Sequence, residues 1–94
     1  MSETTRVEER TVQIANRYGL HARPAAEFVK LASRFSAEVV VRKEDLEVNG
    51  KSIMGMMMLA AERGSHITIR AEGADACEAV SGLASLVESG FGEV

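Results

Sequence analysis

The hydrophobic pattern of the chain switches between the spacing typical of strands and that typical of helices. Apolar and polar residues alternate over Thr11–Ile14, as they do along a half-buried strand. In Ala25–Phe35 the apolar residues instead fall on one helical face, with charged residues opposite. Pro24 fits the first turn of a helix, where its missing N–H is harmless. The sequence therefore predicts a strand and then a helix that begins near His21 or Ala22.

The second half of the chain goes through the same change of spacing. Val39–Val41 is a β-branched run and Leu46–Val48 alternates, so these two segments are predicted to form a hairpin. An Asn-Gly turn signal follows, and Ser52 can then cap a short helix. His66–Arg70 alternates as a strand does, and the apolar positions of Ala76–Val87 mark one face of a last helix.

The predicted order of elements is strand, helix, strand, strand, short helix, strand, helix. This split βαβ plan predicts an α+β fold in which three helices cover one face of a four-stranded antiparallel sheet. The element order leaves the order of the strands in the sheet open. The 94 residues form a single domain over positions 1–94 and leave no room for a second. Residues 1–6 are polar and are predicted to be a frayed N-terminal extension.

Composition and charge narrow the class of function. The chain has 11 Lys and Arg residues against 14 Asp and Glu residues, a net charge of −3, and no Trp. Such a chain is a poor nucleic-acid binder, because that function calls for a basic face and stacking rings. The single cysteine, Cys77, provides neither an internal disulfide nor a metal cluster, and we expect it to pack in the last helix. His66 has no companion ligand at metal spacing.

Nothing in the sequence directs the chain into or across a membrane. No apolar run approaches the ~20 residues that span a bilayer, and the N-terminus has no apolar signal core. We therefore expect a cytoplasmic monomer that makes no membrane insertion and needs no metal ion or organic cofactor.

The segment from Gly19 to Ala26 carries the most informative chemistry. His21 lies where a loop becomes a helix, so free backbone N–H groups and the positive end of the helix dipole face it. The dipole disfavours the imidazolium, and a neutral ring keeps a lone pair for nucleophilic attack. Arg23 supplies a planar donor fork that suits phosphate oxygens. These groups could accept and return a phosphoryl group; the alternative is that His21 only caps the helix while Arg23 is a solvated charge.

Two motifs resemble a known family. Gly19–Ala25 resembles the active-site signature of HPr, the histidine-containing phosphocarriers of the bacterial phosphoenolpyruvate-dependent phosphotransferase system. Val48–Gly55 resembles the second HPr signature, which surrounds a regulatory serine. The resemblance runs from about Val7 to Val87 and implies an open-faced β-sandwich with strand order 1-4-2-3.

The resemblance implies a carrier that partner enzymes phosphorylate, and not an enzyme in its own right. His21 matches the histidine that enzyme I phosphorylates on Nδ1 with a group from phosphoenolpyruvate, and that passes the group to an enzyme IIA component. Arg23 and Ala22 match the positions that stabilise the phosphate. Ser52 matches the serine that HPr kinase/phosphorylase modifies with ATP. The family's docking surface carries over to Ala26, Ile53, Met54 and Met57.

The residues themselves support the assignment of Ser52. A phosphate is well tolerated at a helix start, and its added charge on a docking face would hinder an acidic or apolar partner. Ser52 is also expected to act as a plain helix cap. In the methionine cluster that follows, we expect Met54 to be exposed and Met58 to be buried, with Met56 on a different face.

Two alternatives stay open at this stage. The chain could be the nitrogen-branch paralogue of HPr or a purely regulatory one, which the sequence does not separate from a sugar-transport carrier. More remotely, it could be a split βαβ module that binds a ligand or RNA, in which His21 only caps a helix. That alternative predicts exposed aromatic residues or a basic stripe on the sheet.

Overall fold

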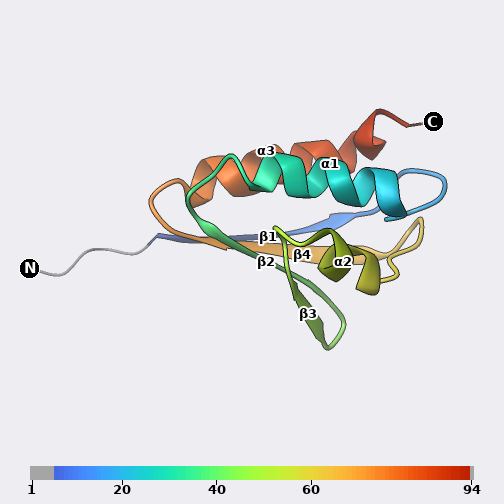
Figure 1. Cartoon of the computed structure of the whole chain (residues 1–94), viewed down its shortest axis with the longest axis horizontal. Coiled ribbons are helices and arrows are strands. Elements are labelled where there is room, and N and C mark those ends of the chain that lie inside the picture. Colours follow the sequence, from blue (N-terminus) through green and yellow to red (C-terminus); the bar gives the residue numbers. More distant parts are fainter. Residues whose placement is uncertain (1–5, 94) are drawn as a thin grey trace, which may run out of the picture.

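The computed structural model describes residues 6–93, and the secondary structure follows the predicted order (Figure 1). The elements are β1 (Val7–Gln13), α1 (Ala22–Ala32), β2 (Glu38–Lys43), β3 (Leu46–Asn49), α2 (Ile53–Met58), β4 (His66–Glu72), α3 (Ala76–Glu88) and the short 3-10 helix η1 (Gly90–Gly92). The predicted N-terminal extension lies, apart from Arg6, outside the described residues. Within residues 6–93, no helix is both long enough and apolar enough to cross a membrane.

The four strands form one antiparallel sheet in the order β1-β4-β2-β3, which is the order that the resemblance implied. β1 begins at Val7, four residues before the alternating segment that predicted it. Residues 7–10 show no clear alternation, but they pair with residues 69–72 of β4, with Val7 opposite Glu72. The backbone N–H and C=O groups of these residues therefore find partners in the neighbouring strand. The side-chain pattern does not decide where β1 begins.

The helices cover one face of the sheet, and α1 and α3 lie side by side along it (Figure 1). The core forms between the two layers, and its fully buried side chains alternate along the strands. From the sheet these include Val12, Val41, Ile67 and Ile69, and from the helices Phe28 and Leu83. The strand residues between them point to the open face of the sheet, which is mostly polar but includes Val40.

The six-residue helix α2 turns a different methionine inward from the one predicted. Met58 is 64% exposed, whereas Met56 is fully buried, so the expectation of a buried Met58 was wrong. Met56 and Leu59 stand three residues apart on the side that packs against the core, and Met58 lies two residues, about 200°, away from Met56. Met54 is exposed, as predicted.

Asp75 and Glu78 have the spacing of a capping box, which predicts that Asp75 caps the last helix, and the structure shows otherwise. Asp75 precedes α3, but its carboxylate accepts hydrogen bonds from the backbone N–H groups of Ser36 and Ala37, at 2.8 Å each, and does not cap its own helix. These bonds tie the α1–β2 loop to the beginning of α3. Cys77, expected to pack, is exposed because the buried face of α3 passes through Ala76 and Val80.

Candidate functional site

The loop between β1 and α1 holds His21 at the end of the molecule where α1 begins. Gly19 has a φ of +68°, and a Cβ at this position would collide with the carbonyl oxygen of Ala61, so only glycine fits. The buried Leu20 then donates its N–H to the same oxygen at 2.9 Å. Because these contacts fix the loop just before His21, the imidazole is carried on a rigid support.

His21 is the N-cap residue of α1, but its ring makes no capping hydrogen bond. Its side chain is 41% exposed, which leaves the ring accessible to a partner. Ala25 donates its N–H to the His21 carbonyl at 3.0 Å, and Pro24 has no N–H. The free N–H groups of the first turn are therefore those of Ala22 and Arg23, which lie next to the imidazole. His21 thus lies at the positive end of an eleven-residue helix, and its imidazole is not engaged in capping that helix.

The imidazole is oriented by a carboxylate from the other end of the chain. Nε2 of His21 lies 3.2 Å from Oε1 of Glu93, and the Nδ2 group of the buried Asn16 donates to the same oxygen at 3.0 Å. An ionised carboxylate only accepts hydrogen bonds, so Nε2 carries the proton in this contact. The lone pair of the neutral ring is then on Nδ1. Nδ1 is also the nitrogen that the family resemblance implied, and its role stays a prediction.

The ionised form of Glu93 is favoured in this position. Partial burial acts to raise the pKa of Glu93, but hydrogen bonds from Asn16 and His21, with the charges of His21 and Arg23, outweigh it and hold the pKa below its usual range. The side chain therefore remains an acceptor for Nε2–H at neutral pH.

Glu93 was not among the predicted site residues. The chain leaves α3, turns at Gly90 and at Phe91, both with positive φ, and returns to the β1–α1 loop, where Gly90 lies against Asn16. A glycine next to the end of α3 signals a turn, but nothing in the sequence near Glu93 indicates that it meets a residue 72 positions earlier.

Arg23 and Ala22, the predicted phosphate-stabilising residues, are exposed in the first turn of α1. Among the described residues, the guanidinium of Arg23 has no ion-pair partner within 4 Å. The charge and donors of Arg23 are therefore available to an incoming anion beside His21.

Ser52 is the N-cap of α2, and its side chain does cap the helix. Oγ accepts a hydrogen bond from the N–H of Gly55 at 3.0 Å, as predicted for a capping serine. The preceding Lys51 is held on both sides, because its backbone N–H donates to Asn49 Oδ1 at 2.8 Å and its Nζ donates to the Phe35 carbonyl at 2.7 Å. The turn that presents Ser52 is thus tied to the end of the α1 region.

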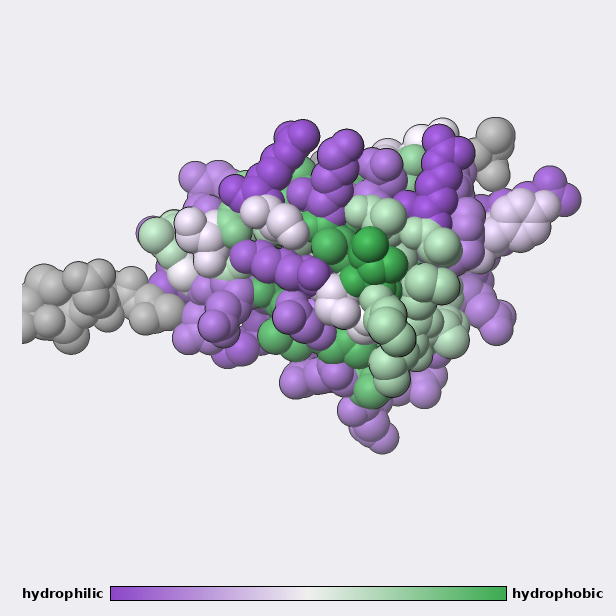
Figure 2. Space-filling view, in the orientation of Figure 1, coloured by the Kyte–Doolittle hydropathy of each residue, from purple (hydrophilic) through white to green (hydrophobic). Residues whose placement is uncertain are grey.

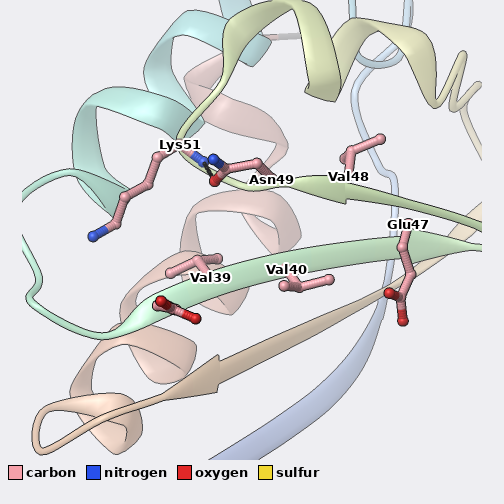
Figure 3. Close-up of a pocket in the computed structure, with 7 residues that line it drawn as sticks. Val39, Val40, Glu47, Val48, Asn49 and Lys51 are labelled. Atoms are coloured by element: carbon pink, nitrogen blue, oxygen red, sulfur yellow. Dashed lines mark hydrogen bonds between the residues drawn. The ribbon is translucent and has the colours of Figure 1, made fainter.

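A pocket of about 420 Å³ lies beside this turn, along the pairing of β2 with β3. Its walls combine acidic, apolar and basic side chains: Glu38, Val39, Val40, Glu47, Val48, Asn49 and Lys51. Figure 3 shows the Asn49 side chain turned back toward the backbone of Lys51, to which it is hydrogen-bonded. None of the predicted site residues lines this pocket, so we do not assign the chemistry of His21 to it.

The predicted docking residues of α2 form an exposed apolar surface. Ile53, Met54 and Met57 are exposed, and so is Met58, which adds to the predicted set. Ala26 is half-buried on α1, which packs against α2. Figure 2 shows hydrophobic side chains gathered over α2 and the neighbouring start of α1.

Comparison with known proteins identifies the family. Residues 8–89 match the family model PTS-HPr, described as the PTS HPr component phosphorylation site. This chain belongs to the PTS-HPr family. It is 48% identical over 85 residues to the phosphocarrier protein HPr of Neisseria meningitidis serogroup B, covering 90% of this chain and 96% of that protein. Membership confirms the resemblance and identifies the chain as a phosphocarrier of the phosphotransferase system, not an enzyme.

Two further relatives are informative, one about the type of phosphocarrier and the other about the fold. The phosphocarrier protein NPr of Proteus mirabilis is 45% identical over 85 residues, covering 89% of this chain and 94% of that protein. The crystal structure of an HPr from Thermoanaerobacter tengcongensis superposes with a TM-score of 0.89 at 49% identity, covering 93% of this chain and 98% of that one. The open-faced fold predicted from the resemblance is therefore confirmed.

Proposed function

We propose that His21 accepts a phosphoryl group on Nδ1 from enzyme I, which draws it from phosphoenolpyruvate, and passes the group to an enzyme IIA component. The observation that carries this proposal is the engagement of Nε2 by Glu93, because it directs the lone pair of the neutral ring to Nδ1. The position of the ring, exposed at the start of α1, supports it further.

The transfer needs no proton to leave the imidazole. The Nδ1 lone pair forms the bond to phosphorus while the bond between phosphorus and the donor's carrying atom breaks, and that atom keeps the electron pair. The ring becomes cationic with its proton still on Nε2, and the carboxylate of Glu93 stabilises this charge. Transfer to the next protein reverses these changes and leaves His21 neutral again.

Arg23 and Ala22 stabilise the phosphoryl oxygens in this proposal. The N–H groups of both residues and the guanidinium of Arg23 supply donors at the positive end of α1. Donors fixed in the fold before the reaction do not need to reorganise as charge moves from one protein to the other.

The exposed surface of α2 docks the partners, and Ser52 regulates that docking. Met54 and Met57 present flexible apolar side chains, beside those of Ala26 and Ile53, that adapt to more than one partner, enzyme I and enzyme IIA among them. HPr kinase/phosphorylase transfers a phosphoryl group from ATP to Ser52 Oγ. The added charge, close to two units negative, stands beside this apolar surface and weakens the binding of enzyme I.

A nitrogen-branch or purely regulatory role is the second candidate. Its support is the 45% identity to NPr, which is close to the 48% identity to an HPr. Transfer assays with sugar-type and nitrogen-type IIA proteins separate the two roles, since the faster acceptor identifies the branch.

The ligand- or RNA-binding alternative finds little support on the open face of the sheet. Arg42 lies near Glu9 and Glu47, and Arg70 lies near Glu9 and Glu72, with each nitrogen–oxygen distance between 3.8 and 4.0 Å. The arginines are therefore interleaved with carboxylates and make no basic stripe. None of the described strands carries a Phe, Tyr or Trp side chain, and the single ring on them is the imidazole of His66 at the start of β4.

The carrier acts in the cytoplasm as a monomer, where its three protein partners meet it. Light scattering coupled to size-exclusion chromatography measures the mass in solution. A mass near 10.1 kDa supports the monomer, and twice that value contradicts it.

Labelling with radioactive phosphoenolpyruvate and enzyme I tests the function. We expect the wild-type chain to take up an acid-labile label and His21→Ala to take up none, while Ser52→Ala is labelled normally. Phosphorus–nitrogen coupling in NMR spectra of the labelled protein assigns the nitrogen. Label on His21→Ala, or on Nε2 of the wild type, would overturn the proposal.

A further inference from the structure

Tyr18 is a large, strongly exposed side chain beside the phosphorylation site. It lies in the β1–α1 loop, and 72% of its surface is accessible. Its ring meets that of His21 edge to face, with centroids 6.3 Å apart and an angle of 83° between the planes. Within residues 6–93, Tyr18 is not among the partly buried hydrophobic side chains that pack against the core.

Arg17 lies against the exposed ring of Tyr18. Its guanidinium carbon lies 5.5 Å from the centroid of the Tyr18 ring, within the range of a cation–π contact. Together with Arg23 on the first turn of α1, it places two exposed positive charges near His21. This is a local excess of positive charge on a chain whose net charge is −3.

A partner that transfers a phosphoryl group to His21 must also come close to Tyr18. A protein that donates a phosphoryl group to His21 must bring the phosphorus within bonding distance of the imidazole. Its surface then also covers the neighbourhood of the imidazole, and the centroid of the Tyr18 ring lies 6.3 Å from the centroid of that ring. Tyrosine and arginine are also the residue types that most often dominate the energy of protein interfaces.

We infer that Tyr18, held by Arg17, is a specificity-determining contact for the protein that donates the phosphoryl group to His21. The partner it fits offers an apolar recess for the ring, bordered by carboxylates that face Arg17 and Arg23. This contact is separate from the apolar surface of α2, and it rests on the proposed function of His21.

Kinetics with the protein donor test the inference. We expect Tyr18→Ala to raise the KM for transfer from enzyme I about tenfold with little change in kcat, because the lost contact contributes to docking alone. Tyr18→Phe keeps the ring and stays within about twofold of the wild type. Arg17→Ala raises KM about threefold and makes the rate less sensitive to salt.

Two control variants match these changes away from the site. Arg34→Ala removes an equal charge just beyond the end of α1, and Leu46→Ala removes an exposed apolar side chain from β3. Neither is expected to alter the KM for enzyme I. Thermal unfolding of every variant verifies that the domain remains folded.

Phosphoramidate, a small phosphoryl donor with no protein surface, separates docking from the reactivity of His21. Tyr18→Ala is expected to react with it at the wild-type rate. The inference is overturned if the KM for enzyme I is unchanged in Tyr18→Ala, or if the reactions with enzyme I and with phosphoramidate slow equally. Failure of the proposed function would look different, since enzyme I would then not label His21 of the wild type at all.

Discussion

His21 and Ser52 both stand at the N-cap of a helix, yet the structure uses their side chains in opposite ways. Ser52 Oγ accepts the hydrogen bond from Gly55 N–H and so completes the six-residue helix α2. The ring of His21 makes no such bond and turns to Glu93 at the other end of the chain. The side chain of Ser52 therefore stabilises α2, whereas that of His21 contributes nothing to the cap of α1.

Asp75, at the N-cap of α3, extends the comparison. Its carboxylate bonds to Ser36 and Ala37 and not to its own helix. Of the three α-helices in residues 6–93, only α2 is therefore capped by the side chain that precedes it. The first turn of every helix offers free N–H donors, but tertiary contacts draw the side chains of His21 and Asp75 to other partners.

Of the changes at the two helix starts, reversing the charge of Arg23 beside His21 is expected to slow phosphoryl transfer most. Arg23→Glu should slow transfer from enzyme I about 100-fold, because a carboxylate replaces a donor and repels the phosphoryl oxygens. The domain should keep its melting temperature within about 2 °C, since the side chain is exposed. Rapid-quench kinetics measure the rate. An unchanged rate would remove Arg23 from the mechanism.

A negative charge at the other helix start should act on docking alone. Ser52→Asp is expected to raise the KM for enzyme I about tenfold while the reaction of His21 with phosphoramidate stays the same. Ser52→Ala, the neutral control, should transfer normally but unfold with about 1 kcal/mol less free energy, because the cap is lost. Equal kinetics of Ser52→Asp and the wild type would argue against a regulatory role for this position.

Removing the carboxylate that holds the imidazole should have a smaller effect. Glu93→Ala is expected to slow transfer about fivefold, because the contact is partly exposed and contributes no more than a modest ion pair. The nitrogen chemical shifts of His21 should then report a mixture of tautomers. If they remain those of a single Nε2–H form, Glu93 does not orient the ring.

The contribution of Asp75, the N-cap residue of α3, to the stability of the fold should depend on pH. Backbone hydrogen bonds, that from Ser36 above all, hold the pKa of Asp75 below its ordinary value of 3.8 despite partial desolvation. A lowered pKa in the folded state stabilises the fold at pH values above 3.8, and this contribution is lost as the pH falls through the folded pKa. Asp75→Asn should therefore be less stable than the wild type at neutral pH, and the gap should close in acid.

Urea unfolding between neutral pH and pH about 2.5 measures this gap. Asp45→Asn, in the exposed β2–β3 turn, is the matched control and should show no comparable difference. A constant gap between Asp75→Asn and the wild type at every pH would mean that the carboxylate's charge does not stabilise the loop.

Much of the site could be predicted because its signals are local. His21, Arg23 and Pro24 lie within four positions, and the consequences of a histidine at a helix start follow from the helix backbone itself. The same holds for Ser52, whose partner Gly55 is three residues away. Tyr18 could have been noticed as an aromatic residue close to His21, but its exposure was not evident from the pattern.

The sequence pattern could not predict which side chains of α2 pack against the core. Six residues make less than two turns, so apolar spacing alone does not decide whether Met56 or Met58 meets the core. Packing against the core selected Met56 and Leu59, and the remaining apolar side chains stayed exposed on the docking surface.

Local sequence patterns were enough to predict the types and order of the α-helices and strands, and the two short segments that carry the chemistry. These depend on residues near one another in the chain, whose spacing and backbone preferences act before any tertiary contact forms. The contact of Glu93 with His21 and the bonds of Asp75 to a loop from another element became visible in the folded chain alone. Such contacts depend on where distant segments meet, and packing of the core sets that.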